Sequence, residues 1–180
     1  LRLMESWLPE PLHRQKIYGF GSTILAHPEN FQMLNAVFSL ILLRFAQNRF
    51  EDAKKKIEET LPVNPRTGQK REMTKEDFTG AGAIFIQEKS KYEYLANLPE
   101  AEDINEAVNE AMRLIEADYE DLAGILPKNF QELDSDLLKG LIRVFNTEAV
   151  RTIKGDAFGR IYEYFLMKFS MSGAGAQEGG

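Results

Sequence analysis

Three basic residues near the carboxyl end of the sequence are the side chains best placed to contact a charged ligand. Arg151, Lys154 and Arg160 flank Gly155-Asp156, where Asp156 is a natural N-cap and an apolar helical pattern begins. Helix N-termini and basic side chains both favour phosphate groups. One interpretation is a contact with the DNA backbone. The other is a solvated loop without a ligand, because an isolated basic cluster in an acidic chain is a weak signal.

No other group of residues has the spacing that catalysis or metal binding requires. The sequence has 2 histidines, His13 and His27, and no cysteine, whereas a zinc site needs three or four ligands. We therefore predict no metal site. The acids of residues 100–121 fall mostly on the polar face opposite an apolar stripe, which favours a solvated helix face over a general acid/base pair.

Two glycine-rich stretches resemble phosphate-binding loops only superficially. GAGAIF, from Gly80, lacks the third glycine of a dinucleotide fingerprint, and GAGAQEGG, from Gly173, precedes no helix in this chain. Neither contains the Gly-Lys-Ser/Thr of a phosphate-binding loop. We interpret both as turns or linkers, so the sequence offers no cofactor-binding residue.

Charge is distributed unevenly along the 180 residues. The formal net charge of −6 argues against a non-specific nucleic-acid-binding protein, because phosphate contacts need clustered lysine and arginine. Residues 1–92 carry +3, residues 93–138 carry −11 and residues 139–180 carry +2. The acidic middle would repel DNA, but the flanks permit a surface that faces it.

The elements that must position these side chains are mostly helical. Apolar residues recur every three or four positions from Phe31 to Phe45, which predicts a helix whose middle is buried on most sides. After Arg49 the pattern becomes amphipathic, and Pro62 predicts the end of the helix. The apolar run is too short to span a bilayer, which needs about 20 residues, so we predict no membrane segment.

A loop and one extended segment follow. Residues 62–82 contain two prolines, glycine and mixed charges, and Thr74 with Asp77 three positions later can cap one helical turn. The β-branched and aromatic run Ile84-Phe85-Ile86 is typical of one short strand or extended segment.

Further helices are predicted over the second half. Lys89–Leu98 can form a short helix, and Ile104–Tyr119 has the most regular amphipathic pattern, with Asp103 as its N-cap. Another helix is predicted to begin near Ser135. Its expected inward-facing residues are Leu137, Leu138, Leu141, Ile142 and Phe145.

The predicted fold is a mostly α, irregular helical bundle with at most one short strand or hairpin. We predict a helical domain over residues 1–154, followed by the last helix and a linker over residues 155–180. Aromatic residues of that last helix could stack on bases, but their helical spacing favours a core stripe. The start, LRLMESWLPEP, has acids and prolines where a signal peptide needs an apolar stretch, so we expect a cytoplasmic protein.

Three segments, in their order and spacing, carry a family resemblance. The first is FSLILLRFAQNRFEDAKKKIEE, residues 38–59. The second is IFIQEKSKYEYL, residues 84–95, followed by INEAVNEAMRLIEADYEDLAGILPKNF, residues 104–130. The third and most specific is GDAFGRIYEYFLMKFSMSGAGAQEGG, residues 155–180. Together they resemble the N-terminal helical region of the modification (DNA methylation) subunit of type I restriction-modification systems.

The resemblance implies a helical domain that leads into a Rossmann-like methyltransferase domain absent from these residues. The full-length subunit of this family is an adenine-specific DNA methyltransferase that uses S-adenosylmethionine and needs no metal. Its implied partners are DNA, a specificity subunit, a second modification subunit and a restriction subunit, with no membrane. The helical domains of the family help to clamp DNA and contact the partner subunits.

The motifs that carry methyl transfer in this family are not found in the chain. That chemistry needs a glycine-rich cofactor loop and an Asn-Pro-Pro-aromatic motif, but Asn64-Pro65 is followed by Arg66. We therefore expect this chain alone to be inactive. The alternative is a non-catalytic helical protein-interaction module, and a free-standing enzyme is least favoured because nucleophiles and metal ligands do not cluster.

Overall fold

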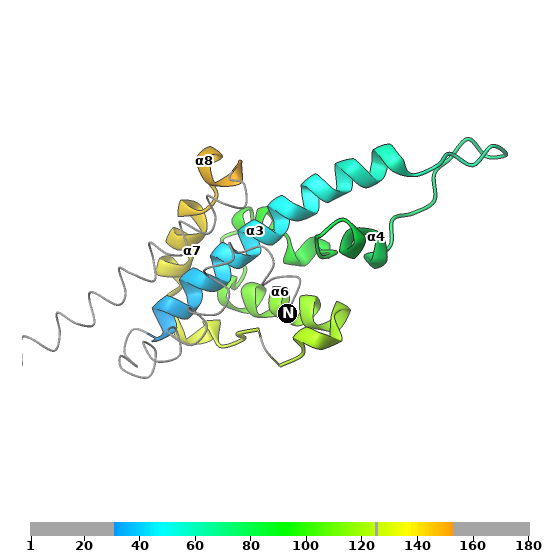
Figure 1. The fold of residues 1–180 in the computed structure, drawn as a ribbon. Helices are drawn as coiled ribbons and strands as arrows, with labels where there is room; N and C mark the ends of the chain where they lie inside the picture. Colours follow the sequence, from blue (N-terminus) through cyan, green and yellow to red (C-terminus); the bar gives the residue numbers. More distant parts are fainter. Residues whose placement is uncertain (1–30, 125, 153–180) are drawn as a thin grey trace, which may run out of the picture.

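The computed structural model describes residues 31–124 and 126–152, which are organised around one long helix (Figure 1). Helix α3 (Phe31–Thr60) has 30 residues and is therefore about 45 Å long. Its residues 36–47 are buried apart from Leu42, which is half-buried. Farther along, Phe50, Ala53 and Ile57 form a single buried stripe. Both the buried middle and the amphipathic end confirm the prediction, as does the end of the helix before Pro62.

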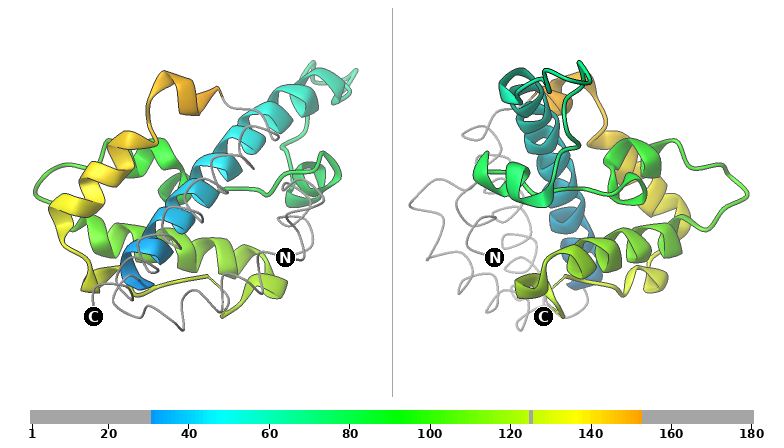
Figure 2. Two further views of the ribbon diagram at one scale, coloured as in Figure 1. Left: turned by 60° about the vertical axis from the view of Figure 1, so that its left-hand side comes forward. Right: turned by 90° about the vertical axis from the view of Figure 1, so that its right-hand side faces the viewer.

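The other elements lie around α3 (Figure 2). Helix α4 packs near the carboxyl-terminal half of α3, and α7 lies on the other side of it. In chain order the elements after α3 are α4 (Lys75–Gly80), η2 (Glu88–Ser90), α5 (Tyr92–Ala96), α6 (Ile104–Asp118), η3 (Glu120–Leu122), η4 (Phe130–Glu132), α7 (Ser135–Val144) and α8 (Glu148–Arg151).

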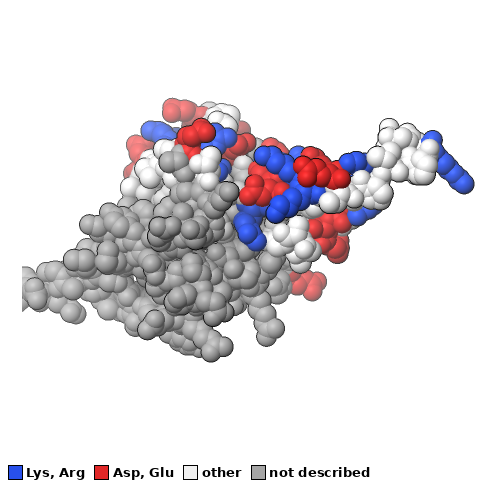
Figure 3. Space-filling model, turned by 45° about the horizontal axis from the view of Figure 1, so that its top comes forward, with Lys and Arg blue, Asp and Glu red and all other residues white. Residues whose placement is uncertain are grey.

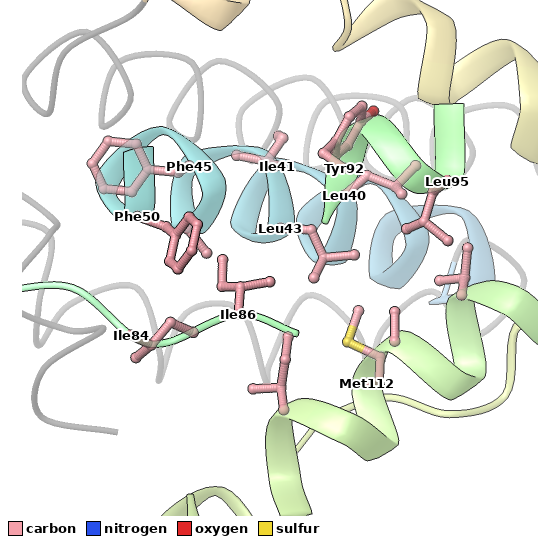
Figure 4. Packing of buried hydrophobic residues seen from close by; sticks show 14 of the residues in the cluster. Leu40, Ile41, Leu43, Phe45, Phe50, Ile84, Ile86, Tyr92, Leu95 and Met112 are labelled. Carbon is pink, nitrogen blue, oxygen red and sulfur yellow. The ribbon is translucent and has the colours of Figure 1, made fainter. Parts of the chain in front are cut away.

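The core lies where α3 meets the extended segment, α5 and α6 (Figure 4). Phe50 of α3 stacks on Phe78 of α4, with ring centroids 4.7 Å apart, and Phe85 meets both rings edge-on. Offset and edge-on aromatic pairs add stabilisation beyond the apolar area they bury. These three rings therefore fix α4 and the extended segment against α3.

The capped turn and the extended segment both form where the sequence predicts them. The Thr74 side chain accepts a hydrogen bond from the Asp77 amide, and the Asp77 side chain accepts one from the Thr74 amide, which completes a capping box. Residues 83–87 are extended but pair with no strand in the described chain. The amide of Phe85 instead donates to the Tyr119 hydroxyl at 2.6 Å.

Buried polar side chains supply hydrogen bonds that a sheet would otherwise provide. Asn105 donates to the carbonyls of Phe130 and Leu133 at 2.7 and 2.9 Å, and Asn109 accepts from the Phe130 amide at 3.1 Å. Ser90 donates to the carbonyl of Ala111 at 2.8 Å. Because a buried unpaired backbone group is costly, these side chains fix the path of the irregular segments.

Helix α6 confirms a predicted N-cap, whereas one residue of α7 faces the other way from its prediction. Asp103 caps α6 by accepting from the amides of Asn105 and Glu106, as predicted. The prediction that Leu137 faces inward is wrong, because its side chain is 40% exposed while Leu138 and Ile142 are buried. The apolar stripe of α7 is wider than its contact with the core, so the residue at its edge stays in solvent.

Several expectations fall on residues that the structure leaves undescribed. The predicted last helix and linker, residues 155–180, lie outside the described residues, as do His13 and His27. No helix in the described part of the chain is long and apolar enough to cross a membrane.

A matched pair of glycine substitutions tests the helix packing. A Cβ at Gly140, inside α7, would meet nothing within 4 Å, so we expect Gly140→Ala to raise the free energy of unfolding by up to about 1 kcal/mol. Gly82 has φ +76° and a Cβ there would lie 2.9 Å from Arg49 Nη2. Gly82→Ala should therefore lower the free energy of unfolding by about 1–2 kcal/mol or more. Urea denaturation of the two variants measures both, and equal effects would contradict the close packing of Arg49 on the Gly82 turn.

Candidate nucleic-acid interface

Arg151 is the one predicted DNA-contact residue that lies in the described part of the chain. It is the last residue of α8, and its side chain is 45% exposed. Its Nη2 atom lies 3.0 Å from Glu93 Oε1 of α5, in an ion pair exposed on both sides. Lys154 and Arg160 lie outside the described residues. The grouping of the three bases therefore stays a prediction.

The position of Arg151 depends on how α8 is attached to α3. The side-chain amide of Asn48 donates to the carbonyl of Val150 at 3.3 Å. The same Asn48 accepts through Oδ1 from Arg44 Nε and Nη2, at 3.2 and 3.0 Å. Arg44 Nη1 also donates to Asn146 Oδ1 at 3.4 Å. Arg44 therefore binds Asn146, just before α8, directly, and it holds Asn48, which binds Val150 within α8.

Arg44 is a buried cation, with only 5% of its surface exposed. Its guanidinium lies 5.1 Å from the centroid of the Tyr92 ring, a favourable arrangement because the ring face is electronegative. The Tyr92 hydroxyl donates to the carbonyl of Ile142 at 2.8 Å. Arg44 and Tyr92 thus join α3, α5 and α7 below the surface that carries Arg151.

The electrostatics of this region follow from burial. Burial lowers the pKa of Arg44 below its ordinary value, and the nearby positive charge of Arg151 acts in the same direction. Burial also raises the pKa of the Tyr92 hydroxyl, which stays a neutral hydrogen-bond donor. An arginine remains protonated even so. Two guanidinium groups therefore lie close together here, and only the exposed carboxylate of Glu93 makes an ion pair with either in the described residues.

The exposed ion pair leaves Arg151 available for an anion. Pairs that are exposed on both sides contribute only about 0–1 kcal/mol, so a phosphate can replace the Glu93 carboxylate at small cost. The buried Arg44 adds positive potential beneath it. Arg44 is visible in the sequence as a lone charged residue that interrupts the apolar run from Val37 to Ala46. Its partners, Asn48 and Asn146, have no comparable signal.

Gly82, directly before the extended segment, lies in a turn, as predicted, whereas Gly80 is the last residue of α4. Both Nε and Nη2 of Arg49 donate to the carbonyl of Gly82, at 3.3 and 2.8 Å. An arginine of α3 therefore packs directly against Gly82. The acids of α6 form ion pairs at its surface, where Arg113 pairs with Glu106 and Glu110. Among the described residues, no group of histidine, cysteine or acidic side chains could hold a metal ion.

Comparisons with known proteins agree on one family. The family model described as HsdM N-terminal domain matches residues 29–145. The type I restriction enzyme MjaIX methylase subunit of Methanocaldococcus jannaschii is 31% identical over an alignment 175 positions long, which covers 89% of this chain. The chain spans 31% of the length of that relative. No solved structure matches the chain.

Substituting the two neighbouring arginines separates a structural role from a surface role. Arg44→Leu should lower the free energy of unfolding by about 2–3 kcal/mol, because it leaves the oxygens of Asn48 and Asn146 without their charged donor. Arg151→Gln should change it by at most about 0.5 kcal/mol, as is usual for exposed side chains. Chemical denaturation measures both values. A loss from Arg151→Gln as large as that from Arg44→Leu would show that Arg151 supports the fold.

Proposed function

This chain belongs to the family of HsdM N-terminal domains, and from that membership we propose that it is the N-terminal domain of a type I restriction-modification methyltransferase subunit. In full length the subunit methylates adenine in DNA with S-adenosylmethionine. The observation that carries the proposal is the family match over residues 29–145, which includes every described helix except α8. The relative in Methanocaldococcus jannaschii, a methylase subunit of a type I restriction enzyme, supports it.

The role of this domain within the subunit is to help clamp DNA and contact partner subunits. Arg151, Lys154 and Arg160 contact DNA phosphates in this proposal. The exposure of Arg151 and the attachment of α8 to α3 support it, since a fixed arginine binds phosphate with little loss of side-chain freedom. The protein partners are the specificity subunit, a second modification subunit and the restriction subunit.

In this proposal cofactor binding and methyl transfer belong to another part of the subunit, because the family's motifs for them are not found in this sequence. The backbone amides of the turn at Gly82 donate to carbonyls of α4, Gly82 to Thr79 and Ala83 to Phe78, and Arg49 binds the Gly82 carbonyl, so this turn offers the cofactor ribose no free amide. Asn64, in the only Asn-Pro pair, accepts from the Arg66 amide at 2.9 Å and belongs to an exposed loop. A flipped adenine requires instead a closed pocket with hydrogen-bonding groups and stacking side chains. We place that chemistry in a Rossmann-like domain of the same subunit.

Charge reversal tests the DNA contact. We expect the triple variant Arg151→Glu, Lys154→Glu and Arg160→Glu to weaken DNA binding by the complete subunit. The dependence of log K on log salt should become less steep by about 0.9 for each phosphate that the protein no longer neutralises. Fluorescence anisotropy with labelled duplex over a range of salt concentrations measures the slope.

The control variant for this test reverses three bases elsewhere, at Lys89, Lys139 and Arg143. It changes the net charge by the same amount, so it accounts for general repulsion of DNA. A triple variant with the same slope as wild type would remove the DNA-contact role of these residues.

Calorimetry tests where the cofactor binds. Titration of S-adenosylmethionine into residues 1–180 should release no binding heat, because the family's glycine-rich cofactor loop and Asn-Pro-Pro-aromatic motif are not found in this sequence, whereas the complete subunit should give a one-to-one isotherm. A helical circular dichroism spectrum first establishes that the shorter chain is folded. A one-to-one isotherm with the shorter chain would contradict the assignment of cofactor binding to another domain.

A further inference from the structure

The segment between α3 and α4 projects from the body of the molecule (Figures 1 and 2). We call residues 62–73 the arm. All of its residues are exposed except Met73, which is half-buried, and Val63 is 53% exposed. The arm therefore contributes almost nothing to the core, and stability of the fold does not explain its composition.

The arm is a narrow, hydrogen-bonded ribbon. Its two sides meet in the antiparallel bridge between Val63 and Lys70. The amide of Asn64 donates to the carbonyl of Gln69, and the amide of Gly68 donates to the carbonyl of Asn64, both at 2.8 Å. The Asn64 side chain also accepts from the Arg66 amide. These bonds hold the tip in one conformation, so it can bind a partner without first becoming ordered.

The base of the arm is attached to both neighbouring helices. Arg71 makes a two-pronged ion pair with Asp77 of α4, with N···O distances of 2.7 and 2.9 Å. The Lys70 amine donates to the carbonyl of Glu58 in α3. The direction in which the arm points is therefore set by α3 and α4.

Every charged residue in the projecting part of the arm is basic. Between Glu59 and Glu72 there is no acidic residue, and the bases there are Arg66, Lys70 and Arg71. Basic side chains mark the far end of the arm in Figure 3, whereas acids and bases alternate along α3. The side chain of Arg66 makes no hydrogen bond or ion pair with the described residues and is free for a ligand.

We propose that the arm enters a groove of double-stranded DNA and that Arg66 and Lys70 contact its phosphates. The inference rests on the proposed function, since it assigns a second DNA contact to the same domain. The major groove is about 12 Å wide and admits a two-stranded ribbon. Each basic side chain there neutralises a phosphate and releases a counterion.

The composition of the arm favours DNA over a protein partner. Protein interfaces depend on a few large anchors, mainly tryptophan, tyrosine and arginine, in dry apolar pockets. The arm has no aromatic residue, and Val63 is its only exposed aliphatic side chain besides two prolines. The residues between Glu59 and Glu72 hold three bases and no acid, which matches instead the composition that phosphate contacts require.

The arm and Arg151 make separate contacts. Asn48, which attaches α8, lies 12 residues before Thr60 at the end of α3, which corresponds to about 18 Å along the helix. Figure 1 shows α8 and the arm at different ends of the molecule. Removal of charge from one of them leaves the other intact, so their effects on DNA binding can be measured independently.

The first test measures salt dependence in the complete subunit assembled with its specificity subunit. The arm variant carries Arg66→Gln and Lys70→Gln, and Arg71 is kept because it pairs with Asp77 in the capping box of α4. Because Lys70 also binds the Glu58 carbonyl, the single variant Arg66→Gln, which leaves the base of the arm intact, is measured beside it and should reduce the slope by about 0.9. The control carries Lys89→Gln in η2 and Arg143→Gln in α7, which remove equal charge outside the arm. Binding of a fluorescent duplex of arbitrary sequence should show a slope of log K against log salt that is about 2 smaller in magnitude for the arm variant. The control should keep the wild-type slope.

The outcomes separate the arm from the proposed function. If wild type binds DNA and neutralising Arg151, Lys154 and Arg160 flattens the slope while the arm variant matches wild type, the arm inference is overturned and the proposed function stands. If the wild-type assembly does not bind DNA, both fail. If the arm variant keeps its slope but the assembly loses a subunit by light scattering, the arm is a protein-docking element and the inference is likewise overturned.

A second measurement tests proximity directly. These 180 residues contain no cysteine, so Thr67→Cys at the arm tip, in a subunit whose other cysteines are replaced, accepts a single iron chelate that cleaves nearby DNA. Strong cleavage from position 67, compared with a chelate attached through Glu102→Cys, is the expected result. Cleavage no stronger than from position 102 would overturn the direct contact even if the slope changed.

Discussion

The described part of the structure depends on the burial of α3, and no sheet among these residues supports it. Its middle is enclosed on nearly every side, so the segments around it must bury backbone groups against a helix that offers them no free amide or carbonyl. Side chains make these hydrogen bonds instead. Tyr119 binds the extended segment, while Asn105 and Asn109 bind the turn at Phe130. The irregular course of the chain is therefore as strongly determined as its helices.

The parts that the sequence predicts well are those governed by local rules. The extent of α3, the capping box at Thr74 and the N-cap at Asp103 follow from periodicity and from side chains within three or four residues of one another. The prediction for Leu137 is wrong because spacing identifies an apolar stripe but not how wide its contact is. The environment of Arg44 depends on Asn146, 102 residues later in the chain. Periodicity over a few residues does not reveal a partner at that separation.

In the candidate nucleic-acid interface, too, local features follow from the sequence and distant contacts do not. Arg151 can be singled out because basic residues near a helix start suggest an anion, but its partner Glu93 lies 58 residues away. For the arm, the sequence predicts only a loop. The acid-free run between Glu59 and Glu72 is present in the sequence, but its projection beyond α3 is a property of the fold. Composition indicates what a segment can bind, whereas the structure decides whether a partner can reach it.

The long reach of the polar contacts of α3 has a consequence for the order of folding during synthesis. Arg44 and Asn48 bond to Asn146 and Val150, each 102 residues later in the chain. A ribosome adds about 5–20 residues per second, so α3 leaves the exit tunnel several seconds or more before these partners exist. During that interval its apolar surface is open to water, and a nascent chain in that state is a substrate for chaperones. Among the described helices, α3 is synthesised first, and its contacts with Asn146 and Val150 form only after nearly all the rest of the described chain has been made.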